Sequence, residues 1–173
     1  METQVETEQI CAESFQVGDM AVHPAHGVGE VTGIEKRDLG GSMNLFYVLR
    51  ILESGLKVMI PVTSTAHVGL RRVMSKNEAD KVLGILRAHE VAVDVQPWNR
   101  RFRAYTEMLK SGSPYEIAKV LRDMYRLKFD KDLSFGERRL LDQAKSLLVN
   151  ELALAKQIKQ VAMEGEISQI FSA

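Results

Sequence analysis

The segment from Gln96 to Arg103 carries the residue types best suited to binding chemistry. The single tryptophan, Trp98, follows a proline, and three arginines lie within the next five residues. Arginine can hold a phosphate through two parallel hydrogen bonds, and an indole ring can stack on, or wedge beside, a base that has left the duplex. This combination predicts contact with nucleic acid. The candidate DNA-binding residues are Trp98, Arg100, Arg101 and Arg103.

A helix is expected to begin in this segment, and it gives the tryptophan a second interpretation. Pro97 suits the first turn of a helix, whose free N–H groups favour anions. An apolar stripe with the spacing of an ordinary hydrophobic core also runs along that helix. It consists of Trp98, Phe102, Tyr105 and Leu109. The two interpretations are compatible if the indole packs at the edge of the core with one face exposed.

Other candidate reactive residues give no positive support for catalysis. His23 and His26 lie three residues apart in a predicted strand–turn segment without a third ligand nearby, so ordinary turn histidines are expected. The single cysteine, Cys11, lies in an acidic segment with no base nearby to activate its thiol. The glycines between Gly27 and Gly33 precede another strand, whereas a dinucleotide-binding loop precedes a helix. We therefore expect no enzyme, no metal and no cofactor.

Charge is unevenly distributed along the chain. The 173 residues include 23 Lys and Arg and 23 Asp and Glu, so the formal net charge is zero. Residues 97–146 nevertheless hold 12 basic and seven acidic residues, whereas residues 1–13 hold four acids and no base. A local positive patch on a neutral protein predicts a polyanion contact on one part of the surface.

Length and composition exclude several classes of protein. At about 100–200 residues per domain, the chain forms one domain or two small ones. No apolar run approaches the roughly 18 residues of a membrane-spanning helix, and the N-terminus has no features of a secretory signal. One cysteine cannot form an internal disulfide, which fits a reducing compartment. We expect a cytoplasmic protein that does not contact a membrane.

Residues 14–73 have the pattern of short strands separated by turns. Apolar and branched residues form runs at 28–34, 45–51 and 56–62, and eight of the 12 glycines lie between Gly18 and Gly69. Glycine supplies the positive φ angles that tight turns require. The pattern predicts a small antiparallel barrel or sheet.

After residue 74 the apolar residues recur with the period of a helix. Three capping boxes precede three such runs, with serines at 75, 113 and 134 each followed three residues later by glutamate. The longest run extends from about Leu140 to Ile158, and residues 164–172 form a short final helix or a frayed tail. We therefore predict an α+β protein of two domains. Its parts are an acidic flexible tail at 1–13, a β domain at 14–73 and an all-α helical bundle at 74–173, with a connector near 88–96.

Both halves of the chain resemble one family, the CarD/CdnL-type bacterial transcription regulators. The first half does so at Phe15–Asp19, His23–Gly29 and Val68–Arg71, in a module that also occurs in transcription-repair coupling factors. The second half does so at Trp98–Phe102, Ala118–Tyr125, Leu133–Arg138 and Leu147–Ala153. The helical half favours a regulator over a coupling factor, because no ATPase motor is present.

The resemblance implies a mechanism. In this family a Tudor-like first module binds the β subunit of RNA polymerase through an exposed strand edge. The helical domain contacts promoter DNA at the upstream edge of the melted bubble, without sequence specificity. Trp98 matches a tryptophan that wedges into the minor groove and stabilises the open complex, and Arg100 and Arg103 match residues that touch the DNA backbone, with Arg101 between them. The polymerase contact is placed at Arg37, Leu49, Ile51, Val58, Met59 and Pro61.

Details of both contacts leave alternatives. Arg37 follows a predicted strand end at Ile34–Lys36, and Met59 stands where the family sometimes carries a second basic residue. Pairing through backbone groups tolerates that change. We expect mainly a monomer, although an unpaired strand edge also permits a domain-swapped dimer. The alternative function is a protein–protein adaptor on RNA polymerase, whose helical domain binds another protein rather than DNA.

Overall fold

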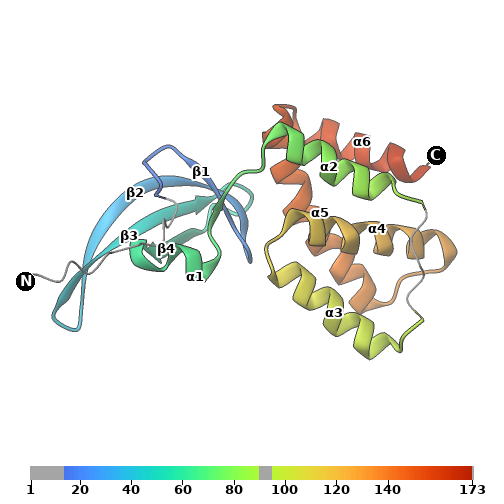
Figure 1. Cartoon of the computed structure of the whole chain (residues 1–173), viewed down its shortest axis with the longest axis horizontal. Coiled ribbons are helices and arrows are strands. Elements are labelled where there is room, and N and C mark those ends of the chain that lie inside the picture. The colour runs from blue at the N-terminus through green and yellow to red at the C-terminus, as the bar shows by residue number, and fades with distance from the viewer. Residues whose placement is uncertain (1–13, 90–94, 173) are drawn as a thin grey trace, which may run out of the picture.

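The computed structural model describes residues 14–89 and 95–172, and these form a sheet and a group of helices that lie next to each other (Figure 1). The sheet is antiparallel, with the strand order β4-β3-β2-β1-β5, so β4 and β5 are its edges. Its strands are β1 (Met20–His23), β2 (Gly27–Leu39), β3 (Ser42–Ile51), β4 (Lys57–Pro61) and β5 (Arg71–Arg72).

A local turn signal builds the long β2–β3 hairpin. Gly40 and Gly41 join the strands with φ angles of 63° and 89°. Two successive positive φ angles are what the favoured two-residue hairpin turn needs, because its twist matches that of the strands. The turn lies between the two apolar runs predicted at 28–34 and 45–51.

The β2 strand is longer than its sequence pattern indicated. It continues to Leu39, so the predicted strand end at Ile34–Lys36 is wrong, and Arg37 lies inside the strand opposite Asn44. The pairing with β3 shifts register between Val31 and Gly33. Such a bulge changes which residues face each side of the sheet, and this alternation decides what the strand presents to a partner.

A short helical segment follows β4 and was not predicted. It consists of η1 (Val62–Ser64) and α1 (Thr65–Val68). Its β-branched residues have low helix propensity and gave no helical pattern. The segment ends at Gly69, which has a φ of 85° and whose backbone N–H donates a hydrogen bond to the carbonyl of Thr65.

Among the described residues, the helical part contains five longer helices. They are α2 (Lys76–Arg87), α3 (Trp98–Lys110), α4 (Pro114–Asp130), α5 (Phe135–Lys156) and α6 (Gln160–Ser172). The capping boxes predicted at Ser75 and Ser134 are confirmed. The one predicted at Ser113 is wrong: its side chain makes no capping bond, and the carboxylate of Glu116 pairs with Lys119 at 2.8 Å instead.

Two separate hydrophobic cores stabilise the two parts. The sheet buries Val31, Tyr47 and Leu49, whereas the helices pack around α5 through residues such as Leu148 and Leu152. The predicted α+β class with two domains is confirmed. The acidic segment 1–13, with Cys11, and residues 90–94 of the connector lie outside the described residues. In the part of the chain that is described, no helix combines the length and apolar character needed to cross a bilayer.

Candidate functional site

Trp98 is the first residue of α3. Pro97 caps the helix in an extended conformation, with φ −54° and ψ 145°, and its carbonyl accepts the amides of Arg100 and Arg101 at 3.0 and 3.2 Å. The chain therefore changes direction at Pro97, and the indole extends from the first turn of the helix. Pro97 is the cap rather than the first helical residue that its sequence suggested.

The Trp98 ring lies at the edge of the helical core. It is half-buried, and its centroid is 5.6 Å from that of Phe102, which is 38% exposed. Further along α3, Tyr105 and Leu109 are buried. The apolar stripe therefore serves as core at its C-terminal end and opens to solvent at its N-terminal end. Trp98 thus packs at the edge of the core and is partly exposed, the arrangement in which core packing and nucleic-acid binding are compatible.

The first turn of α5 closes against the same ring. A Cβ atom on Gly136 would lie 3.6 Å from Cζ2 of Trp98 and 3.7 Å from Cε2 of Phe102. A Cβ at this position would therefore be in ordinary van der Waals contact with both rings, so the N-terminal turns of α3 and α5 lie side by side. Trp98 and Gly136, 38 positions apart in sequence, thus share one surface, formed by the N-terminal turns of α3 and α5, which we call the tryptophan end.

Arg101 differs from the two arginines beside it. Its guanidinium carbon lies 5.4 Å from the centroid of the Trp98 ring, and its Nε is buried with no hydrogen-bond partner among the described residues. A cation over an indole face is attracted by the ring's negative face. Arg100 and Arg103 are exposed. The structure therefore brings all four candidate DNA-binding residues together, with Arg101 packed on the indole and the other two in solvent.

Arginines in the two parts of the molecule differ in their partners. Six of the 12 arginines form ion pairs with carboxylates, namely Arg37, Arg50, Arg71, Arg72, Arg87 and Arg122. Within residues 14–89 and 95–172, the other six form none, namely Arg100, Arg101, Arg103, Arg126, Arg138 and Arg139. Five of these six lie within the first two turns of α3 or α5. The tryptophan end is thus the place where positive charge is least neutralised.

The tryptophan end is remote from the sheet. In Figure 1 the N-terminal ends of α3 and α5 lie on the side of the helical part that faces away from the strands. The free edge of β4 belongs to the other end of the molecule. A partner bound at the sheet and a partner bound near Trp98 would therefore contact opposite ends of one protein.

The candidate polymerase-binding residues divide between the two faces of the sheet. Cross-strand partners share a face, and side chains alternate along a strand. The pairings of Arg37 with Asn44, of Pro61 with Phe46 and of Met59 with Val48 place all three candidates on one face. Arg37 is exposed there and pairs with Glu35 at 3.0 Å. Met59 is 37% exposed.

Three other candidates lie on the core face of the sheet. Leu49 and Ile51 are 0% and 2% exposed, and Val58, paired with Leu49, is half-buried against the same core. Buried side chains cannot contact a partner without unfolding the sheet. Leu49 and Ile51 therefore present no side chain at the surface, and their part in polymerase binding stays a prediction. Their strand, β3, is also paired on both sides, so it offers no free edge.

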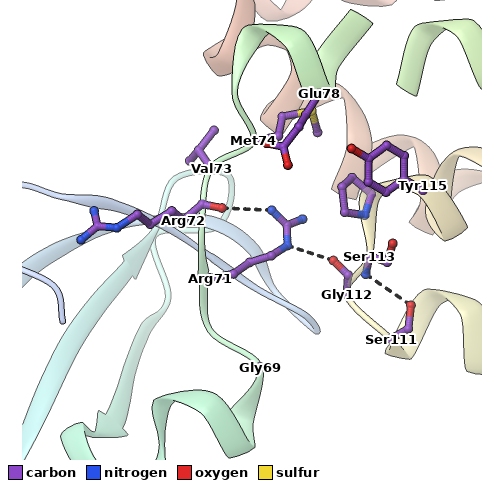
Figure 2. A pocket seen from close by; sticks show the side chains of 11 residues that line it. Gly69, Arg71, Arg72, Val73, Met74, Glu78, Ser111, Gly112, Ser113 and Tyr115 are labelled. Atoms are coloured by element: carbon purple, nitrogen blue, oxygen red, sulfur yellow. Dashed lines mark hydrogen bonds between the residues drawn. The ribbon is translucent and has the colours of Figure 1, made fainter. Parts of the chain in front are cut away.

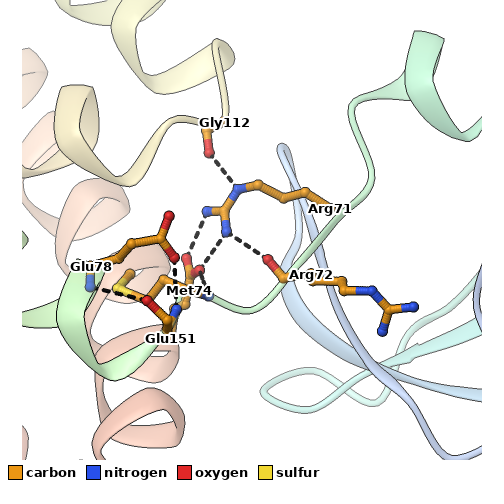
Figure 3. Close-up of polar contacts among 7 residues, drawn as sticks. Arg71, Arg72, Met74, Glu78, Gly112 and Glu151 are labelled. Atoms are coloured by element: carbon orange, nitrogen blue, oxygen red, sulfur yellow. Dashed lines mark hydrogen bonds and ion pairs between the residues drawn. The ribbon is translucent and has the colours of Figure 1, made fainter. Parts of the chain in front are cut away.

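A buried ion pair joins the two parts of the molecule and was not found from the sequence. Arg71 of β5 donates through both terminal nitrogens to the carboxylate of Glu151 on α5, with Nη2–Oε2 at 2.7 Å (Figure 3). Glu151 is 1% exposed and also accepts the amide of Met74 at 3.0 Å. The Nε of Arg71 donates to the carbonyl of Gly112 at 3.0 Å. A glutamate inside the apolar stripe of α5 was the available signal.

The turn between β1 and β2 also contacts the helices. We call this turn, together with the Arg71–Glu151 ion pair, the joint. A Cβ on Gly112, whose φ is 71°, would lie 3.1 Å from Cβ of Pro24, and one on Gly27 would lie 3.5 Å from Leu147 of α5. The Nδ1 of His23 accepts the amide of Ala25 at 3.0 Å. Partial burial, followed by the nearby charge of His26, lowers the pKa of His23. The His-Pro-x-His-Gly motif is thus a docking turn against the helices.

A groove of about 430 Å³ lies beside the joint, between β5 and the turn that connects α3 and α4 (Figure 2). Several of its polar lining residues are already paired with neighbours. Arg71 bonds to Gly112, the amide of Ser113 donates to Oγ of Ser111, and Glu78 completes a capping box. No group of three or more potential metal ligands occurs among the described residues. The joint is therefore organised as a structural contact.

Comparisons with known proteins match both parts of the chain. Residues 15–74 match the model of the CarD-like/TRCF RID domain, and residues 81–168 match that of the CarD C-terminal domain. A relative from Bacillus subtilis (strain 168), named "Putative transcription factor YdeB", is 33% identical over 153 residues, which cover 87% of this chain and 99% of that protein. A solved structure, "CdnLNt from Myxoccoccus xanthus", is 49% identical and covers 39% of this chain and 94% of its own, with a TM-score of 0.32.

Proposed function

The chain belongs to the CarD family, whose members are transcription regulators that interact with RNA polymerase rather than enzymes, and from this we propose that it stabilises open promoter complexes. In this proposal the sheet attaches the protein to the β subunit of the polymerase. The tryptophan end then contacts promoter DNA at the upstream edge of the melted bubble.

The edge strand β4 and one face of the sheet support the polymerase contact. Along β4, the backbone pairs with β3 on one side only among the described residues, so its other side can accept a further strand. Arg37, Met59 and Pro61 share the face next to that edge. We therefore propose that the partner contacts β4 backbone groups and these side chains, without Leu49 and Ile51.

The tryptophan end supports the DNA contact, and it is the observation on which the proposal depends. A half-exposed indole lies among arginines that have no carboxylate partner within the described chain. Phosphate contacts from Arg100 and Arg103 would position the helix without reading sequence, while the indole contacts bases that have separated. One base–aromatic stack contributes roughly 1–3 kcal/mol. A shift of about 1.4 kcal/mol changes an equilibrium tenfold, which is sufficient for regulation.

Attachment at one end strengthens a weak contact at the other. A tethered binding module acts at a raised effective concentration, provided that the geometry lets both contacts form together. The Arg71–Glu151 pair fixes the sheet to α5, whose N-terminal turn lies against Trp98. The joint therefore supports presentation of the indole in a constant position relative to the polymerase.

The lifetime of open complexes tests the proposal. RNA polymerase holoenzyme is loaded on a ribosomal-type promoter and challenged with a competitor, in the presence of wild-type protein or the Trp98→Ala variant. We expect the variant to shorten the lifetime about tenfold, because one stacking contact is lost. Far-UV circular dichroism and binding to polymerase are measured in parallel and should not change.

Two results would contradict the proposal. A folded, polymerase-bound Trp98→Ala protein with the wild-type lifetime would remove the wedge. The adaptor alternative predicts that a variant lacking the side chains of Arg100 and Arg103 changes the capture of a protein partner and leaves the promoter complex unaffected.

A further inference from the structure

Phe135 is an aromatic residue whose exposure the fold does not explain. It is the first residue of α5 and is 83% exposed, the largest value of any phenylalanine in the described chain. The capping box at this helix start is formed by its neighbours: Ser134 accepts the amide of Glu137 at 3.3 Å, and Glu137 accepts that of Ser134 at 3.1 Å. Neither bond involves the ring of Phe135. A small or polar residue at position 135 would leave the same capping box in place.

The position of Phe135 places it at the tryptophan end. A Cβ added to the next residue, Gly136, would lie within van der Waals distance of both Trp98 and Phe102. Successive Cα atoms are about 3.8 Å apart, so the backbone of Phe135 is one residue from that contact. Three aromatic side chains from two helices therefore gather at one end of the molecule, and Phe135 is the most exposed of them.

Unneutralised charge accompanies this ring. Arg139 follows Phe135 by four residues and Gly136 by three, so the helical period places it on the same face of α5. It is exposed and has no ion pair within the described residues. An exposed aromatic ring next to free arginines is complementary to a base and its phosphates, whereas an apolar protein surface would not need the charges.

We propose that Phe135 is a second nucleic-acid contact, which stacks on a base exposed at the edge of the bubble beside the one that Trp98 contacts. Arg139 holds the adjoining phosphate. The contact rests on the proposed function of the tryptophan end and extends it from one aromatic residue on α3 to two residues on neighbouring helix starts. The bound surface is then formed by α3 and α5 together.

The test compares four variants in the open-complex assay with holoenzyme and full-length protein. Phe135→Ala should shorten the lifetime about fivefold, the lower end of the effect of one base–aromatic stack. Phe135→Trp should keep the wild-type lifetime, and Phe135→Leu should behave like the alanine variant, because stacking needs a flat ring. Val161→Ala removes an equally exposed apolar side chain from α6 and is the matched control, with no expected effect.

A second readout reports the contact directly. Promoters carry the fluorescent base 2-aminopurine at single positions along the upstream edge of the bubble, and stacking on an aromatic ring quenches its emission. We expect Phe135→Ala to raise the emission at a position different from the one that Trp98→Ala affects.

The other possible results distinguish the contact of Phe135 from the proposed function of the protein. If Trp98→Ala shortens the lifetime while Phe135→Ala does not, the second contact is wrong and the proposed function stands. If neither variant has an effect, the proposed function itself fails. If Phe135→Ala weakens the binding of polymerase without promoter, or if Phe135→Leu matches the wild type, the ring contacts protein and the inference is overturned.

Discussion

Towards the C-terminal end of α5, the carboxylate of Glu151 accepts hydrogen bonds from both terminal nitrogens of Arg71. At the N-terminal end of the same helix, Arg138 and Arg139 have no carboxylate partner in the described chain. The first site also uses the amide of Met74 and excludes solvent from Glu151. The second is exposed and lies beside Trp98. One helix thus carries a closed, neutralised joint at one end and an open, charged surface at the other.

This difference separates arginines that hold the fold from arginines that are available to a partner. A buried ion pair contributes little net stability compared with apolar packing, but the loss of one member leaves an unpaired charge and is costly. An exposed arginine without a partner contributes little to stability and keeps its donors free. We therefore expect substitutions at the joint to change stability, and substitutions at the tryptophan end to change binding.

Removal of Glu151 should have the largest effect. The Glu151→Ala variant leaves Arg71 and the amide of Met74 without their acceptor, and we expect the free energy of unfolding to fall by about 3 kcal/mol, near the lower end for a broken buried pair because Arg71 is partly exposed. Urea denaturation followed by circular dichroism measures the change. Glu30→Ala removes the carboxylate of the exposed pair with Arg50 and should lose less than about 1 kcal/mol. Equal losses in the two variants would refute the special role of the joint.

A methyl group at Gly112 should disturb the joint from its other side. Gly112→Ala places a side chain in the left-handed region and 3.1 Å from Cβ of Pro24, so we expect a loss of about 2 kcal/mol. Gly40→Ala, at φ 63° with nothing within 4 Å, carries only the backbone penalty of about 1 kcal/mol. The excess, measured in the same denaturation series, reports the contact between Pro24 and the α3–α4 turn. Equal losses in the Gly112 and Gly40 variants would mean that Pro24 moves away from the added methyl group without a cost in stability.

Arg37 is the strongest test of the distinction between paired and unpaired arginines. It is ion-paired with Glu35 and is nevertheless proposed to bind a partner. Its side chain is exposed, so the pair is weak and can be exchanged. We expect Arg37→Glu to weaken binding to the polymerase β subunit about tenfold through charge reversal at the contact. Surface plasmon resonance with immobilised polymerase measures this, with circular dichroism as the folding control. Undiminished binding would move the contact away from this face of the sheet.

Loss of a single free arginine should have a smaller effect. Arg103→Ala removes one proposed phosphate contact, so the slope of log lifetime of the open complex against log salt concentration should fall by about one unit. Arg87→Ala removes an exposed arginine that pairs with Glu166 on α6, and it should leave the slope unchanged. The comparison fails if the paired and unpaired arginines behave alike.

The smallest predicted effect is on the pH dependence of stability. Burial and the charge of His26 lower the folded-state pKa of His23, so the unfolded chain binds more protons as the pH falls through about 6.5. Stability contributed by neutral His23 is therefore complete above that pH and declines below it, as Nδ1 loses its bond from Ala25. Denaturation between pH 7.5 and 5.5 should show a steeper decline for the wild type than for His23→Gln. If stability declines equally with pH in the wild type and in His23→Gln, protonation of His23 does not affect the stability of the docking turn.

Features that depend on near neighbours in the chain were predictable. The two-glycine turn at Gly40–Gly41, the capping boxes at Ser75 and Ser134 and the helical period after residue 74 all follow from local backbone preferences. Even here a local pattern did not always decide, since Glu116 pairs with Lys119 and leaves the serine at 113 without its box. The clustering of Trp98 with three arginines was equally visible, because it is a property of eight consecutive residues.

The tertiary structure decided what those residues touch. Glu151 pairs with Arg71 across 80 positions, and Phe135 lies at the tryptophan end because the first turn of α5 packs beside that of α3. The register between β3 and β4 pairs Leu49 with Val58 and Val48 with Met59, and so places Leu49 and Met59 on opposite faces of the sheet. The spacing of apolar residues predicts which face of a strand or helix a residue occupies. It does not predict which two faces pack together, because the free energy of that packing is spread over contacts between residues far apart in the chain.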